Sequence, residues 1–164
     1  MTTNDSAAGE SAFSVSRTMN APVARAWDAW RDPELIRRWW GPAGFTATVA
    51  DVDFREGGRT LVGMRMGEGP EMCNTWTYTA IDEHRRIEFV SRFADRSGAE
   101  VDPGQVGLPP ELPREVRHVV VFAPAGDGGT EVTVEEYGYA PGPMLEQSRL
   151  GQEQVMDKMA ALFA

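Results

Sequence analysis

From residue 45 to residue 137 the sequence repeatedly alternates apolar and polar residues with a period of two. At 130–138, for example, Val132 and Val134 alternate with glutamate and threonine. This pattern is typical of antiparallel strands that have one face in the core and the other in water. Turn sequences rich in glycine and acidic residues separate the runs. The sequence therefore predicts six strands, at about 45–54, 59–67, 72–82, 86–93, 115–123 and 130–138.

A first strand at 13–19 and a short helix are predicted ahead of this region. Val23, Trp27 and Trp30 recur at the spacing of one helix face. Pro22 suits the first turn of that helix, because it lacks an amide hydrogen that would be unpaired there.

A second short helix and a long final helix complete the pattern. Asp32 is a favourable N-cap and Pro33 a favourable first residue, and Gly41-Pro42 ends the second helix because proline cannot extend helical hydrogen bonding. From about Pro143 a helical stripe returns, with Gly151 inside it. We therefore expect an α+β fold, in which a seven-stranded curved antiparallel sheet surrounds a long C-terminal helix. Where helix and sheet do not touch, a cavity remains.

Length and charge restrict the classes of protein. A chain of 164 residues suits one domain, which we place at 12–164, with a small, polar and disordered tail at 1–11. A net charge of −9 disfavours nucleic acid and anionic membranes as partners. Since no apolar stretch approaches the ~18 residues of a membrane span, and no signal peptide is recognisable, a cytoplasmic protein is expected.

The sequence offers no motif for a cofactor, a metal or a catalytic nucleophile. The single cysteine, Cys73, excludes an internal disulfide, and the two histidines lack matched ligands for a metal. The acidic pairs Asp51/Asp53 and Glu135/Glu136 are interpreted as solvated. No cofactor, metal or catalytic residue is therefore predicted.

His118 and the aromatic residues are the candidates for a pocket. His118 shares a strand face with Val116 and Val120, so it points into the fold, although a structural core histidine is the preferred interpretation. The proline-rich connection 94–114 is long enough to act as a lid. The residues predicted to line a cavity are Trp39, Phe45, Trp76, Tyr78, Phe89, Phe93, His118, Gln152 and Met156.

The segment from Asp32 to Pro42, which reads DPELIRRWWGP, resembles proteins similar to the activator of the heat-shock chaperone ATPase, a branch of the START-like superfamily. The turn at 55–58, Gly107-Leu108-Pro109 and the turn at 129–132 follow in the order of that family. The resemblance covers about 13–163 and implies a helix-grip fold around a cavity. The family includes carriers of small apolar molecules, cyclases and co-chaperones of the stress response, and it shares no catalytic motif.

One departure from the family concerns the last helix. Relatives usually have a tryptophan after the glycine, but here Gln152 follows Gly151. Either the amide lines the pocket, or the helix is rotated and the amide meets water; a buried amide needs hydrogen-bond partners.

Three functions follow from these observations. The preferred one is a binding domain for a small hydrophobic or aromatic molecule, acting as a monomer or homodimer. The alternatives are a co-chaperone whose partner is a heat-shock ATPase, and a cyclase- or hydrolase-type enzyme that would use His118. A binding protein is preferred over an enzyme.

Overall fold

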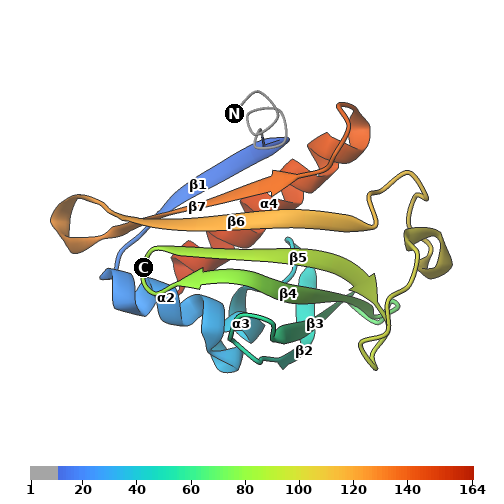
Figure 1. The fold of residues 1–164 in the computed structure, drawn as a ribbon, viewed down its shortest axis with the longest axis horizontal. Helices are drawn as coiled ribbons and strands as arrows, with labels where there is room; N and C mark the ends of the chain where they lie inside the picture. The colour runs from blue at the N-terminus through green and yellow to red at the C-terminus, as the bar shows by residue number, and fades with distance from the viewer. Residues whose placement is uncertain (1–10) are drawn as a thin grey trace.

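A seven-stranded antiparallel sheet, curled into a half-barrel, forms the body of the computed structural model, which describes residues 11–164 (Figure 1). The tail predicted at 1–11 lies outside the described residues except for Ser11. The strand order is β1-β7-β6-β5-β4-β3-β2. The strands are β1 Phe13–Met19, β2 Phe45–Asp51, β3 Arg59–Met66, β4 Met72–Asp82, β5 Arg86–Ala94, β6 Glu115–Pro124 and β7 Thr130–Tyr137.

Three α-helices complete the fold: α2 Val23–Arg31, α3 Pro33–Trp39 and α4 Pro143–Ala161. The first two lie between β1 and β2 in the chain and carry it from one edge of the sheet to the other, since β1 pairs with β7 while β2 pairs with β3. Figure 1 shows the long helix α4 crossing one face of the sheet. The predicted α+β helix-grip architecture is confirmed. No helix of the described residues is long and apolar enough to cross a membrane.

The bend between the two short helices is fixed by local hydrogen bonds. The Asp32 side chain accepts a hydrogen bond from the amide of Glu34 at 2.9 Å, as expected of an N-cap. The indole nitrogen of Trp39 donates to the carbonyl of Ala29 at 2.7 Å and so ties the helices together. At the start of α2, Pro22 is itself the N-cap residue and makes no side-chain cap.

Strand β2 ends at Asp51 rather than at the predicted residue 54. The chain leaves the sheet there, and the ring of Phe54 packs edge-on against those of Trp27 and Tyr78, at 5.6 and 5.1 Å between centroids. Packing of the half-buried Phe54 against the core takes the place of further strand pairing.

Helix α4 holds the connection between α3 and β2 in place. The Lys158 ammonium donates to the carbonyls of Pro42 and Phe45 at 3.2 and 2.9 Å, and the Gln154 side chain accepts from the amide of Ala43 at 3.1 Å. Burial of Lys158 lowers the pKa of its ammonium. These contacts tie one end of α4 to the chain segment that follows Trp39.

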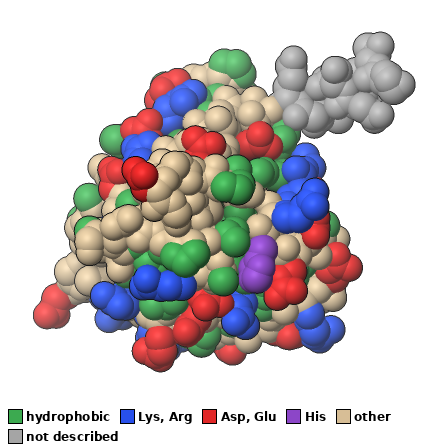
Figure 2. Space-filling model, turned by 90° about the vertical axis from the view of Figure 1, so that its left-hand side faces the viewer, with side chains coloured by type: hydrophobic (Ala, Val, Ile, Leu, Met, Phe, Trp, Pro, Cys, Tyr) green, Lys and Arg blue, Asp and Glu red, His purple; other side chains and the backbone are tan. Residues whose placement is uncertain are grey.

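The face in Figure 2 carries basic and acidic side chains interspersed with small separate apolar groups. Several of the ion pairs of the molecule are exposed, such as Arg31 with Asp28 and Arg85 with Asp82. Exposed pairs contribute little to stability, so the fold depends chiefly on its aromatic and aliphatic core.

Candidate functional site

A cavity of about 510 Å³ lies between the sheet, helix α4, helix α3 and the long connection 94–114. This volume falls within the range of small-molecule sites, which is roughly 300–1,000 Å³. Residues of β4, β5 and β6 form one wall, and residues of α4 face them.

Four rings stand in a row along this wall, and each comes from a different element. Trp39 of α3 stacks on Trp76 of β4 at 6.2 Å between centroids and 17° between planes. Trp76 stacks on Phe89 of β5 at 4.9 Å and 27°, and Phe89 stacks on His118 of β6 at 4.6 Å and 12°. We call Trp39, Trp76, Phe89 and His118 the ring stack. The rings of Trp39, Trp76 and Phe89 are only 1–2% exposed, so each contributes a small part of its surface to the cavity wall.

The indoles of Trp30 and Trp40 also line the cavity, but their nitrogens do not face it. Both nitrogens are inaccessible to solvent and lack a hydrogen-bond partner among the described residues. The rings of Trp40 and Trp76 meet edge to face, with 5.4 Å between the centroids and 77° between the planes. This geometry is a favourable contact between aromatic rings. These donors are therefore not available to a ligand in the cavity.

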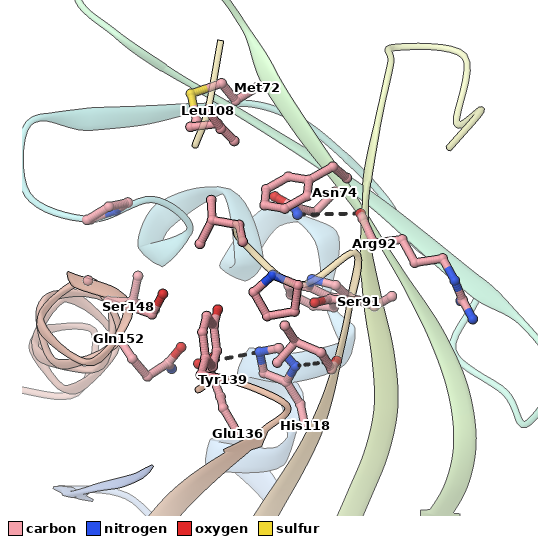
Figure 3. Close-up of a pocket in the computed structure, with 18 of the residues that line it drawn as sticks. Met72, Asn74, Ser91, Arg92, Leu108, His118, Glu136, Tyr139, Ser148 and Gln152 are labelled. Carbon is pink, nitrogen blue, oxygen red and sulfur yellow. Dashed lines mark hydrogen bonds and ion pairs between the residues drawn. The ribbon is translucent and has the colours of Figure 1, made fainter. Parts of the chain in front are cut away.

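The polar end of the cavity is built around His118 and Glu136 (Figure 3). These residues are directly paired across β6 and β7, and Nε2 of His118 lies 3.4 Å from Oε2 of Glu136. Glu136 is 4% exposed and the His118 side chain 14%. Nδ1 of His118 lies 3.1 Å from the carbonyl oxygen of Val116.

Both ring nitrogens of His118 lie close to protein oxygens. A carbonyl oxygen only accepts hydrogen bonds, so the tautomer that carries a proton on Nδ1 donates to Val116. Nε2 lies within ion-pair distance of the Glu136 carboxyl group. Neither ring nitrogen therefore points into open space in the cavity.

Tyr139, Ser148 and Gln152 extend the polar end toward helix α4. Figure 3 shows the side chains of Tyr139, Ser148 and Gln152 gathered beside Glu136. Burial raises the pKa of the Tyr139 phenol, and the neighbouring Glu136 carboxylate raises it as well. Tyr139 is therefore a neutral hydrogen-bonding group at ordinary pH.

The long connection 94–114 covers one side of the cavity with Leu108, Pro109, Leu112 and Pro113. It contains a short 3-10 helix at Pro103–Val106 that the sequence did not predict. The Arg114 side chain pairs with Asp102 at 3.0 Å and with Glu100 at 3.4 Å, which closes the base of the connection. The segment predicted as a lid thus lies over the cavity and has ordered contacts of its own.

Six of the nine residues predicted to line a cavity lie in its wall: Trp39, Trp76, Phe89, Phe93, His118 and Gln152. Phe45, Tyr78 and Met156 do not. Tyr78 is 2% exposed and its hydroxyl lies 2.7 Å from that of Thr60, in the core. Met156 is fully buried between α4 and the sheet, while Phe45 packs beside Gly41 at the start of β2.

Phe45, Tyr78 and Met156 were misplaced because alternation identifies only the inner face of a strand. It does not show which part of that face the helix covers and which part borders the cavity. Tyr78 is on the inner face, at a level where other core side chains contact it. Gln152 lines the cavity while Met156, one turn further along α4, is enclosed. The cavity therefore occupies only part of the length of the concave face.

Sequence reasoning missed Glu136, Tyr139 and Ser148. The interpretation of the pair Glu135/Glu136 as solvated was wrong for Glu136, which is buried. The alternation itself contained the signal, since Val132, Val134 and Glu136 share one face of β7. Tyr139 follows the strand, where no period identifies an inner face, whereas Ser148 lies one turn before Gln152 on α4, so the helical period contained its signal. No cluster of three or more metal-ligating side chains occurs in residues 11–164.

Solved structures with the same fold come from several bacteria. A protein from Mycobacterium smegmatis is 29% identical over 92% of this chain and 89% of its own, with a TM-score of 0.72. A protein from Chromobacterium violaceum is 24% identical over 92% and 95%, with a TM-score of 0.74. An AHSA1 protein from Silicibacter pomeroyi is 17% identical over 92% and 95%, with a TM-score of 0.72. The last two likenesses are evidence for the fold alone.

A search of curated proteins found no significant match. The family model described as activator of Hsp90 ATPase homolog 1-like protein matches residues 20–164, which include both short helices, six of the strands and helix α4. The resemblance noted in the sequence is thereby confirmed, and the chain belongs to the activator of Hsp90 ATPase homolog 1-like family.

Proposed function

We propose that this domain binds a small, mostly apolar aromatic molecule in the cavity between the sheet and α4. The observation that carries the proposal is the ring stack, which borders an unfilled volume of about 510 Å³. Aromatic walls with a few polar groups at one end are typical of sites that hold and orient such molecules.

Gly151 supports the proposal from the opposite wall. It lies in the interior of α4, where glycine costs about 1 kcal/mol relative to alanine. A β-carbon at this position would meet only the Cγ of Pro42, at 4.0 Å. Packing therefore does not require a glycine here, and its effect is to leave space in the cavity.

The arrangement of His118 favours binding over catalysis by this residue. A general acid or base must reach the ligand with a ring nitrogen. Both nitrogens of His118 are directed at protein oxygens, those of Val116 and Glu136. His118 therefore contributes the last ring of the ring stack to the cavity wall. It does not offer a free ring nitrogen to a ligand.

The family suggests a second candidate function, interaction with a heat-shock chaperone ATPase. This function would use the outer surface instead of the cavity. A pull-down that returns the chaperone, with equal yield from a variant whose cavity is filled, would support it.

The test of cavity binding begins with native mass spectrometry of freshly purified protein, which detects a bound compound directly. Binding of naphthalene-based probes is then measured for Gly151→Leu and for Gly151→Ala as the matched control. We expect the leucine side chain to occupy the cavity and reduce affinity at least about tenfold, while alanine leaves affinity nearly unchanged. Equal affinity in the leucine variant, or no binding of any compound to the wild type, would overturn the proposal.

A further inference from the structure

We infer that the His118–Glu136 pair makes the cavity selective for uncharged aromatic molecules that carry a hydroxyl or carbonyl group, over carboxylates and ammonium ions. This inference rests on the proposed function, because it specifies the chemical class of the ligand in the same cavity.

Every charge at the cavity wall already has a partner among the described residues. Apart from Tyr139, the ionisable residues that line the cavity are Arg92, Arg114, His118 and Glu136. Arg92 pairs with Glu115 at 2.8 Å, outside the cavity. Arg114 pairs with carboxylates of its own connection, and His118 pairs with Glu136.

An ionised ligand is unfavourable in this site. It would lose its hydration, and the wall offers no unmatched charge of opposite sign to replace it. A carboxylate placed at the polar end would approach Glu136, and an ammonium would compete with His118 for the same carboxyl group. Both kinds of ion are therefore disfavoured relative to a neutral molecule of the same shape.

One neutral hydrogen-bonding group remains free at the same end of the cavity. The amide of Gln152 lines the cavity and makes no hydrogen bond to the described residues. It offers both donors and an acceptor, and the hydroxyls of Ser148 and Tyr139 lie beside it. A ligand carbonyl can accept from Gln152, and a ligand hydroxyl can both donate and accept there.

The selectivity is tested with three probes that share one ring system: 2-naphthol, 2-naphthoate and 2-naphthylmethylammonium. At pH 7 they are neutral, anionic and cationic. Their affinities for the wild-type protein are measured by isothermal titration calorimetry. We expect 2-naphthol to bind at least about tenfold more tightly than either ion.

The outcomes separate the two proposals. If none of the three probes binds, the proposed function fails. If the naphthol binds but either ion binds as tightly, cavity binding stands and the selectivity for neutral ligands is overturned.

Variants test whether the pair is the origin of the selectivity. In Glu136→Gln the negative charge is lost, and we expect the affinity ratio to shift at least about fivefold toward 2-naphthoate. In His118→Phe the partner of Glu136 is lost, and the ratio is expected to shift toward the ammonium. Glu135→Gln, on the outward face of the same strand, is the matched control and should leave the ratio unchanged. Affinity ratios that are the same in all three variants would overturn the assignment of the selectivity to this pair. Circular dichroism verifies that each variant folds. If a variant does not fold, the three probes measured on the wild type still decide the selectivity.

Discussion

The ring of Phe89 lies nearly parallel to the imidazole of His118, with 4.6 Å between the centroids and 12° between the planes. On its other side Phe89 stacks on Trp76, and it also meets Tyr78 edge to face. Phe89 is only 1% exposed. It therefore belongs to the core and to the cavity wall at once, and its position links the polar end of the site to the aromatic wall.

Enlargement of Phe89 is expected to affect stability before it affects the cavity. In Phe89→Trp the extra ring would press on Trp76 and His118, and such overpacking costs typically 1–3 kcal/mol. Urea unfolding should show a lower midpoint with a similar slope. A variant as stable as the wild type would indicate that the ring extends into the cavity, and its ligand capacity would then be reduced.

Replacement of Gly151 by alanine is expected to stabilise the protein. The methyl group reduces the freedom of the unfolded chain and meets only Pro42 at van der Waals distance, so the gain should be about 0.5–1 kcal/mol. Thermal unfolding measures it as a rise in Tm. A fall in Tm would contradict the open space seen beside this glycine.

Removal of the Tyr78 hydroxyl tests the buried hydrogen bond to Thr60. Tyr78→Phe leaves the fully buried Thr60 hydroxyl without its partner, which should cost about 1–3 kcal/mol. Burial raises the pKa of Tyr78 to about 12, so this effect should not vary between pH 6 and pH 9. In a double-mutant cycle, Thr60→Val should lower the free energy of unfolding less in the Tyr78→Phe background than in the wild type. Strictly additive losses would show that the two hydroxyls do not interact.

Glu88 provides a pH-dependent contribution to stability. Burial acts to raise the pKa of Glu88, but hydrogen bonds from Arg86 and Arg117, at 2.7 and 3.0 Å, outweigh it and lower the pKa below 4.5. A carboxylate whose pKa is lowered by folding stabilises the protein above its unfolded-state pKa, and this contribution is lost as the pH falls through the lowered value.

Glu88→Gln should therefore cost about 0.2–1 kcal/mol at pH 7, and the difference from wild type should shrink in acid. Urea unfolding at a series of pH values measures this. Glu111→Gln, at an exposed carboxylate without an ion pair among the described residues, is the control for removal of one negative charge. A constant difference at every pH would contradict the ion-pair interpretation.

The strands and helices were predictable because each has a local cause. The period of two located all seven strands, and Asp32-Pro33 and Gly41-Pro42 marked the limits of α3 to within two residues. The short helix at Pro103–Val106 was not predicted, since its cap depends on Gln105 bonding back to Asp102 in a segment without apolar periodicity. The end of β2 was missed because the tertiary packing of Phe54 determines it.

The sequence by itself determined the order of elements, the inner face of each strand and membership of a family, because hydrophobic period and turn chemistry act over a few residues. Only the tertiary structure decided that Glu136 pairs with His118, that Gln152 faces the cavity, and that Tyr78 and Met156 do not. These relationships depend on where α4 lies along the curved sheet and on the register between β6 and β7. Both are set by contacts between residues far apart in the chain, which no local pattern records.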